Sequence, residues 1–248
     1  MLASTLYIHK LFIEMSFSRV CSLGTICHTG RFMQRLKIKN TSYPFDWVFS
    51  DSKGVIDCLQ DGFDKLLDPK YYVDIKNKYS DRSCGHSLYH EDFFFHKDPR
   101  NEDDHHYYKR CVDRFKKLCD SQENKLFIFF LSPENTKHPA DLSLMMESGS
   151  TKESVIEVMK QQGRELNTEL TKHTSNYRLV LIMNFGGNET QTYNFEQEGD
   201  IDFLTLNTRF ASKGVTFNEG WINNRDPDNY YLSGVFSELY QFTVMHFS

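Results

Sequence analysis

Three short apolar runs constrain the fold of this chain more than any other feature of its sequence. The first is KLFIFFL at Lys125 to Leu131, and the others are Leu179 to Asn184 and Ile201 to Asn207. Apolar residues at successive positions point to both faces of a strand, and strands buried on both faces are typical of parallel sheets. A fourth run, Arg19 to Leu23, precedes them. Together they predict a parallel sheet that is covered on both sides.

Segments with helical periodicity lie between these runs. We predict helices at residues 51–68, 103–119, 151–173 and 232–240, and weaker strands at 71–75 and 87–95. Strands that alternate with helices predict βαβ units. The expected fold is therefore a three-layer α/β sandwich with a central, mostly parallel sheet and an N-terminal strand-turn-helix. We expect residues 1–14 to be an extension ahead of a single α/β domain at 15–248, with Met15 as an alternative start to Met1.

The charge balance and the cysteines indicate the class of partner and the compartment. The net charge is −5, so no basic field is available to collect phosphates, and we expect no nucleic-acid partner. The six cysteines show no C-x-x-C spacing, which favours free thiols in a reducing compartment. Charged residues interrupt the first fourteen positions too early for a signal peptide or a membrane span. We therefore expect a cytoplasmic protein without a membrane partner or a cofactor.

The segment from Arg19 to Ser50 contains the candidate nucleophile. A short strand turns at Ser22-Leu23-Gly24 and enters a helix, for which Thr25 is the predicted N-cap. Cys27 follows, where the helical N–H groups have no intrahelical partner and the helix dipole is positive. A thiol in this position ionises more readily, and Arg31 one turn on adds to the effect. Cys27 is therefore the predicted nucleophile.

A cysteine nucleophile requires a histidine base, and His96 is the preferred candidate. It follows the aromatic run Phe93 to Phe95, which we expect to be a strand anchored in the core. Asp98 lies two residues later, on the same face of an extended chain. Either Asp98 or Asp46 is expected to orient the base, and His90 is the reserve base.

These residues and their neighbours also allow an anion-binding or a metal-binding interpretation. Ser22 and Gly24 either donate to an oxyanion or phosphate at the helix N-terminus, with Arg31 as a third ligand-binding residue, or form a tight turn that needs a glycine. A group of cysteine and histidine side chains fits no familiar zinc spacing, so no metal site is expected. Its members are Cys84, His86, His90 and His96.

Two parts of the sequence resemble a known family. The order Ser-Leu-Gly-x-x-Cys, a short helix and Ser-Tyr-Pro-Phe-Asp-Trp is similar to the opening of the family described as "putative papain-like cysteine peptidases", found in bacteria and large DNA viruses. The matching residues are Ser22, Leu23, Gly24, Cys27, Ser42, Tyr43, Pro44, Phe45, Asp46 and Trp47. The family's His-Asp element resembles His96 and Asp98. The resemblance implies a thiol protease or related hydrolase, and a host-cytoplasmic location if the protein is viral.

The order of elements differs from that of a papain domain, which begins with helices and ends in an antiparallel barrel. Among hydrolases it is closer to the fold of GDSL-type esterases, in which the nucleophile follows the first strand. The tail resembles that family's terminal Asp-x-x-His motif at Asp228, but Tyr231 stands where the histidine would be. The catalytic pair of that family is therefore broken in this chain.

Two functions remain open at this stage. In the first, Cys27 attacks a carbonyl and His96 takes and returns the proton, as in a cysteine hydrolase or acyl transferase acting on a protein, peptide or other acyl substrate. In the second, a non-catalytic or GDSL-like module binds an anionic or sugar ligand at the same turn. An imidazole next to the Cys27 sulfur favours the first function, and a distant one favours the second. The sequence defines neither a specificity pocket nor an oligomeric state.

Overall fold

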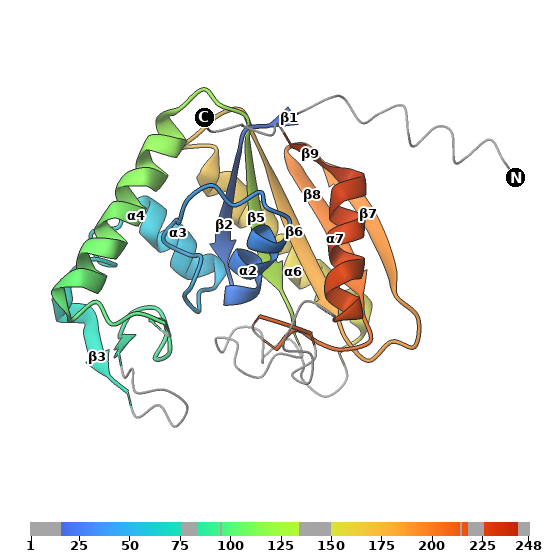
Figure 1. Ribbon diagram of the computed structural model, residues 1–248, viewed down its shortest axis with the longest axis horizontal. Helices are drawn as coiled ribbons and strands as arrows, with labels where there is room; N and C mark the ends of the chain where they lie inside the picture. The colour runs from blue at the N-terminus through green and yellow to red at the C-terminus, as the bar shows by residue number, and fades with distance from the viewer. Residues whose placement is uncertain are drawn as a thin grey trace, which may run out of the picture.

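A five-stranded sheet with the order β2-β5-β6-β8-β7 forms the centre of the protein (Figure 1). The structure is a computed structural model that describes residues 16–75, 84–94, 96–133, 150–213, 215–217 and 226–242. Four strands are parallel, and β7 runs antiparallel to β8 at one edge. The strands are β2 (Arg19–Gly24), β5 (Lys125–Leu131), β6 (Tyr177–Phe185), β7 (Thr192–Glu198) and β8 (Ile201–Asn207). The three apolar runs and the first strand therefore pair as predicted.

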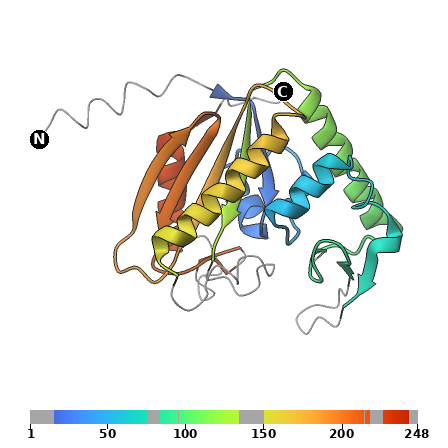
Figure 2. The same ribbon diagram turned by 180° about the vertical axis from the view of Figure 1, so that it is seen from behind.

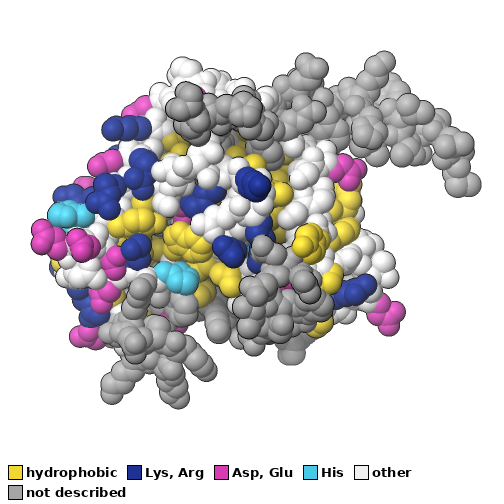
Figure 3. Space-filling model, in the orientation of Figure 1, with side chains coloured by type: hydrophobic (Ala, Val, Ile, Leu, Met, Phe, Trp, Pro, Cys, Tyr) yellow, Lys and Arg dark blue, Asp and Glu magenta, His cyan; other side chains and the backbone are white. Residues whose placement is uncertain are grey.

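Helices cover both faces of this sheet. On one face pack α3 (Ser52–Gln60), α4 (Glu102–Asp120) and α6 (Lys152–Leu170). Helices α3 and α6 lie in front in Figure 2, and α4 lies at the side. On the other pack α2 (Cys27–Arg35) and α7 (Pro227–Leu239), which lie in front in Figure 1. The predicted α/β fold with a three-layer arrangement is confirmed. In the space-filling view, Lys and Arg are the main charged side chains near the centre of the α2 and α7 face (Figure 3).

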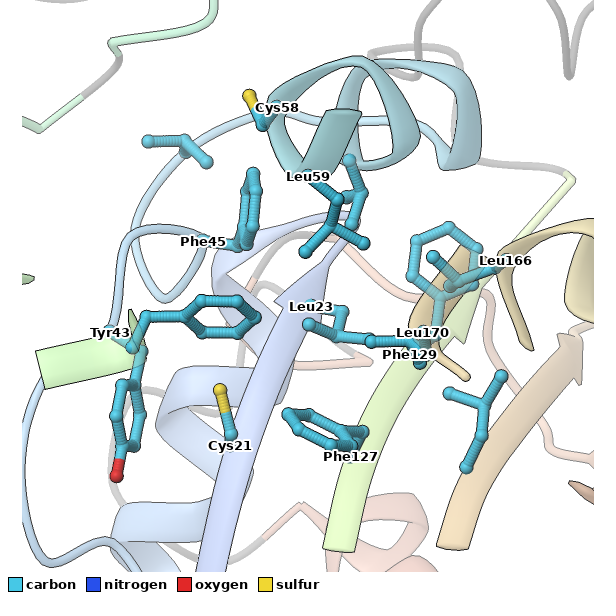
Figure 4. Packing of buried hydrophobic residues seen from close by; sticks show 14 of the residues in the cluster. Cys21, Leu23, Tyr43, Phe45, Cys58, Leu59, Phe127, Phe129, Leu166 and Leu170 are labelled. Atoms are coloured by element: carbon cyan, nitrogen blue, oxygen red, sulfur yellow. The ribbon is translucent and has the colours of Figure 1, made fainter. Parts of the chain in front are cut away.

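Alternate residues of the central strands supply two separate cores. In β5, Phe127 and Phe129 point toward α3, α4 and α6, whereas Ile128 and Phe130 point toward α2 and α7. All four side chains are fully buried. Figure 4 shows Phe127 beside Cys21 of β2, and Phe129 near Leu166 and Leu170 of α6. The apolar runs are continuous because each residue has a core to enter on its own side.

Local sequence signals set the starts of several helices. The side chains of Asn101, Thr151 and Asp226 each accept a hydrogen bond from a backbone N–H of the first turn of α4, α6 and α7, respectively. Three acidic residues also occupy the first turn of α4, where they complement the positive end of the helix dipole. The predicted helices at 103–119 and 151–173 are thereby confirmed, and the C-terminal helix begins earlier than expected because Asp226 caps it.

The predicted helix at 51–68 is too long, because α3 ends at Gln60. Gly62 adopts a left-handed conformation at φ 63°, and the N–H of Phe63 donates to the carbonyl of Cys58 at 2.8 Å. These contacts close the helix end, as a glycine after the last turn commonly does. The apolar periodicity of the sequence continues past Gln60 because the side chains of Phe63 and Leu66 are buried, although both residues lie in a turn.

The predicted strand at 87–95 is also wrong. Residues 87–94 form turns after the short hairpin of β3 (Tyr72–Asp74) and β4 (Cys84–His86), and Phe95 lies outside the described residues. Phe93 and Phe94 are nevertheless buried, with 1% of each surface exposed. Strand β7 was not predicted, because most of its side chains are exposed and polar and it pairs only with β8.

The remaining short elements are a 3₁₀ helix (Pro69–Tyr71) and the paired strands β1 (Ser16–Phe17) and β9 (Gln241–Phe242). The predicted extension at 1–14 and Met15 lie outside the described residues. Within the described part of the chain, no helix combines the length and the hydropathy that a membrane crossing requires. All six cysteines are buried and unpaired, as predicted.

Replacing Phe129 with alanine tests the two-sided core. Its ring is fully buried in the central sheet, so Phe129→Ala is expected to lower the free energy of unfolding by about 3–5 kcal/mol. Phe210→Ala is the matched control, because 45% of the Phe210 surface is exposed and its loss leaves no core cavity. Urea unfolding followed by circular dichroism measures both changes. Equal effects in the two variants would contradict the described packing.

Candidate active site

Cys27 is the first residue of α2, directly after the turn that follows β2. The N-cap is Ile26, which offers no side-chain hydrogen bond, so the predicted cap at Thr25 is wrong. The Thr25 hydroxyl instead donates to the carbonyl of Phe130 at 2.6 Å and ties the turn to β5. The helix therefore begins where the turn is fixed against the neighbouring strand, rather than at a capping side chain.

The loop at residues 42–50 connects this turn to the histidine-bearing segment. The N–H of Ser50 donates to the carbonyl of Thr25 at 2.9 Å, and the N–H of Phe49 donates to the carbonyl of Phe93 at 3.1 Å. Gly24 permits the close approach, because a Cβ there would lie 2.0 Å from the Ser50 hydroxyl oxygen. One short loop therefore holds two parts of the chain that are distant in sequence.

The fully buried Asp46 fixes the conformation of this loop. Its Oδ2 accepts a hydrogen bond from the N–H of Tyr43 at 2.9 Å and forms an ion pair with Lys39. Burial raises the pKa of Asp46, and the Lys39 charge opposes that shift. The Asp46 carbonyl lies against α2 at Gly30, where a Cβ would be only 2.7 Å away. The contacts of Asp46 are therefore those of a residue that shapes the loop.

The loop brings Cys27 and His96 together. The distance from Cys27 Sγ to His96 Nε2 is 3.0 Å, across 69 positions of sequence. The contact expected from the sequence is therefore present. The rings of Trp47 and His96 make an edge-to-face contact, with ring centres 5.7 Å apart and an interplanar angle of 82°. Cys27 exposes 3% of its surface and His96 is partly exposed.

The ionisation of Cys27 differs from the expectation. Burial raises the pKa of the thiol to about 12, and the nearby Asp46 charge acts in the same direction, whereas the hydrogen bond from its own N–H acts against them. The loss of hydration therefore outweighs the favourable position at the helix start. The thiol therefore carries its proton at neutral pH, with His96 Nε2 within hydrogen-bond distance of the sulfur.

The other predicted site residues lie in different surroundings. Asp98 accepts hydrogen bonds from Arg100 Nε at 2.8 Å and from the Arg100 N–H at 3.0 Å, and the Arg100 interaction lowers the pKa of Asp98. The exposed Arg31 donates to Gln34 at 3.2 Å. His90 Nδ1 accepts from the N–H of Asp92 at 3.0 Å within a turn. The structure therefore brings Cys27 and His96 together and directs Asp98, Arg31 and His90 to other partners.

The backbone donors near the turn divide into two groups. The N–H of Gly24 donates to the Ser22 hydroxyl at 3.2 Å, and the N–H of Thr25 donates to the Phe130 carbonyl at 3.3 Å. Ser22 is fully buried and completes this turn. The N–H groups of Cys27 and His28 belong to the first helical turn, where no intrahelical carbonyl accepts from them, although the Cys27 N–H also interacts with its own sulfur. The second group is therefore the one suited to an oxyanion.

His28 points away from Cys27 into a buried polar network. Its Nδ1 accepts from the Ser212 hydroxyl at 2.6 Å, and its Nε2 donates to Asn229 Oδ1 at 3.0 Å. The ring stacks on Phe130 with centres 4.9 Å apart. The sequence of contacts, from Ser212 through His28 to Asn229, is like that of a catalytic serine with its base and an orienting amide. However, Ser212 and His28 expose none of their surface. This network therefore joins α2 to α7 instead of facing a substrate.

The tail motif that resembles GDSL-type esterases has a structural role. Asp228 accepts hydrogen bonds from the N–H groups of Arg209 at 3.2 Å and Phe210 at 3.0 Å. It thereby anchors the loop after β8 to the start of α7. Tyr231 packs at the edge of the core on the α2 and α7 side.

Sequence reasoning missed the contributions of Trp47, Phe49 and Ser50. Trp47 is among the residues that match the family, but no pattern in the sequence indicates that its ring contacts the candidate base. The useful signal was the dense cluster of aromatic and proline residues in 42–50, which indicates a rigid loop. Its partners depend on backbone hydrogen bonds that no residue pattern encodes.

Comparisons with known proteins give one match. A family model described as "Putative papain-like cysteine peptidase (DUF1796)" matches residues 18–176. No curated protein and no solved structure matches the chain. The matched segment contains the β2 turn, the loop at 42–50, His96 and the first two strands of the central sheet.

The pH dependence of alkylation tests the ionisation of Cys27. Because the pKa is raised to about 12, the thiolate fraction is expected to rise about tenfold per pH unit between pH 7 and 10. In urea-unfolded protein the alkylation rate of Cys27 should level off near pH 9, just above the ordinary pKa of a thiol. Mass spectrometry of iodoacetamide-treated protein gives both profiles for the Cys27 peptide. A native profile that levels off below pH 8 would show an activated thiolate instead.

The acid dependence of folding tests the His28 network. Burial lowers the pKa of His28 to about 4, so below pH 6.5 the unfolded chain takes up a proton that the folded protein does not. As the pH falls from 7 to 4, the free energy of unfolding of the wild type should therefore decrease by roughly 3 kcal/mol more than that of His28→Gln. Denaturant unfolding of both proteins at each pH measures the difference between their free energies of unfolding. The contributions of the other titrating groups are the same in both proteins and cancel. A difference that is constant with pH would contradict burial of a neutral ring.

Proposed function

The chain belongs to the family described as putative papain-like cysteine peptidases, and from this premise we propose that it is a cysteine-dependent hydrolase or acyl transferase. Cys27 is the proposed nucleophile and His96 the proposed base. The observation that carries the proposal is the 3.0 Å contact between Cys27 Sγ and His96 Nε2 at the start of α2. A binding module without catalysis gives no reason for a thiol and an imidazole to meet at this point.

The proposed reaction begins from a neutral pair. Because the thiol is protonated, His96 Nε2 removes the proton as the sulfur attacks the carbonyl carbon of the substrate. The negative charge then develops on the carbonyl oxygen, and the first-turn N–H groups of Cys27 and His28 are the proposed donors to it. The positive end of the α2 dipole favours the same charge.

Collapse of this intermediate completes acyl transfer. The carbonyl double bond re-forms, the bond to the leaving group breaks, and His96 returns its proton to the leaving nitrogen, oxygen or sulfur. A thioester on Cys27 remains. Attack by water, which His96 deprotonates, releases the acid and restores the thiol. Attack by another nucleophile gives transfer in place of hydrolysis.

Trp47 is the proposed positioning residue for His96. Its edge contact restricts rotation of the imidazole, which a base must hold toward the sulfur. Asp98 is a weaker candidate for this role than the sequence suggested, because its carboxylate binds Arg100. The loop at 42–50 thus supports the proposal in two ways, by joining the two segments and by supplying the aromatic contact.

Substitutions at the two reacting side chains test the proposal. We expect Cys27→Ala to abolish turnover in a library of fluorogenic peptide, ester and thioester substrates, and His96→Gln to reduce kcat by roughly a hundredfold or more. Cys58→Ala is the matched control, because Cys58 is fully buried in α3 and should retain activity. Asp98→Asn should change kcat by only a few fold. Undiminished turnover of a library substrate by Cys27→Ala would refute the assigned nucleophile.

A further inference from the structure

A hollow of about 230 Å³ lies between the end of α2 and the first turns of α7, and nothing in the proposed reaction uses it. Its lining residues are Arg35, Leu36, Asn229, Tyr230 and Ser233. None of them is acidic. The two helices lie on the face shown in Figures 1 and 3, where Lys and Arg are the main charged side chains near the centre.

Arg35 is the unusual member of this set. Its guanidinium group donates to Asn229 Oδ1 and to the carbonyl of Val215 at 3.2 Å, and its Nε is buried without a partner among the described residues. No described carboxylate forms an ion pair with it. A partly buried charge normally has an ionic partner, because desolvation is costly.

The surroundings of Arg35 do not neutralise it fully. Asp226, whose charge acts to raise the pKa of Arg35, accepts hydrogen bonds from the N–H of Phe217 at 2.8 Å and from Asn229 Nδ2 at 2.9 Å. The negative end of the α2 dipole supplies a partial charge of only about half a unit. Arg31, one turn earlier, adds a like charge that lowers the pKa of Arg35 together with burial. Among the described residues, a net positive charge therefore remains at the hollow.

We propose that this hollow binds the carboxylate of a small organic acid or of an acidic peptide side chain. The planar fork of a guanidinium group matches a carboxylate, and Asn229 holds the fork in place. The hydroxyl groups of Tyr230 and Ser233 are further donors in the lining. Leu36 and the Tyr230 ring offer apolar surface to the carbon chain. The volume suits one side-chain-sized acid, since drug-sized ligands need about 300 Å³ or more.

This inference is independent of the proposed reaction. It depends on Arg35 and α7, whereas the reaction depends on Cys27 and His96. Loss of binding at the hollow and loss of turnover are therefore separate results.

Calorimetric titration of the full chain tests the site. Glutarate is the free-acid probe and N-acetyl-glutamate amide is the peptide probe, and we expect one of them to bind at a single site with a dissociation constant on the order of 1 mM at low salt. The tighter of the two identifies the source of the carboxylate. Tighter binding of inorganic phosphate than of either acid would overturn the carboxylate assignment.

Variants separate the site from general charge attraction. Arg35→Lys keeps the charge but loses the fork, and should weaken binding roughly tenfold. Tyr230→Ala is the second variant, because 61% of the Tyr230 surface is exposed and the fold does not depend on it. It should weaken binding several fold. Arg31→Ala is the charge control, with an expected change within about twofold. No binding by the wild type, or equal losses in Arg31→Ala and Arg35→Lys, would overturn the proposal.

Discussion

Coverage of both faces of the central sheet is the constraint on which the rest of the structure depends. Once β5 and β6 are enclosed by helices, polar side chains are accommodated at the ends of the strands. At the carboxyl end of β6, Asn184 accepts hydrogen bonds from the Ser132 hydroxyl at 3.3 Å and the Ser212 N–H at 3.2 Å. The turn that leads to Cys27 follows β2 at the same edge. Sites of α/β proteins commonly form there for this reason.

The second constraint is the buried charge of Asp46. The buried carboxylate is tolerated because the Lys39 ammonium group and a backbone N–H compensate its loss of hydration. The resulting loop conformation places the N–H groups of Phe49 and Ser50 against their carbonyl partners. The same charge also disfavours a thiolate on Cys27. The group that helps to assemble the pair therefore also helps to keep the Cys27 thiol protonated. A protonated thiol relies on proton transfer during attack rather than on a preformed thiolate.

The sequence predicted the features that depend on local pattern. The apolar runs identified the parallel strands, because a strand with two buried faces leaves a continuous signature. The pairing of Cys27 with His96 was expected from a helix start and a family resemblance, and the two side chains are in contact. The failures have a tertiary cause. Phe93 and Phe94 are buried from a turn, and the apolar stretch after Gln60 is not helical because Gly62 and Phe63 adopt positive φ. The raised pKa of Cys27 reflects packing that no spacing of residues reveals.

The boundary of the family match has a consequence for how much of the chain this fold requires. The matched segment ends at residue 176, one position before β6 begins. A fragment cut there would keep β5 but expose the unpaired backbone edge of its KLFIFFL run, a sequence suited to intermolecular strand addition. The remainder must therefore supply a strand to protect that edge and a helix to cover α2, whatever its residues. In this chain β6 pairs with β5 and α7 packs on the same face as α2.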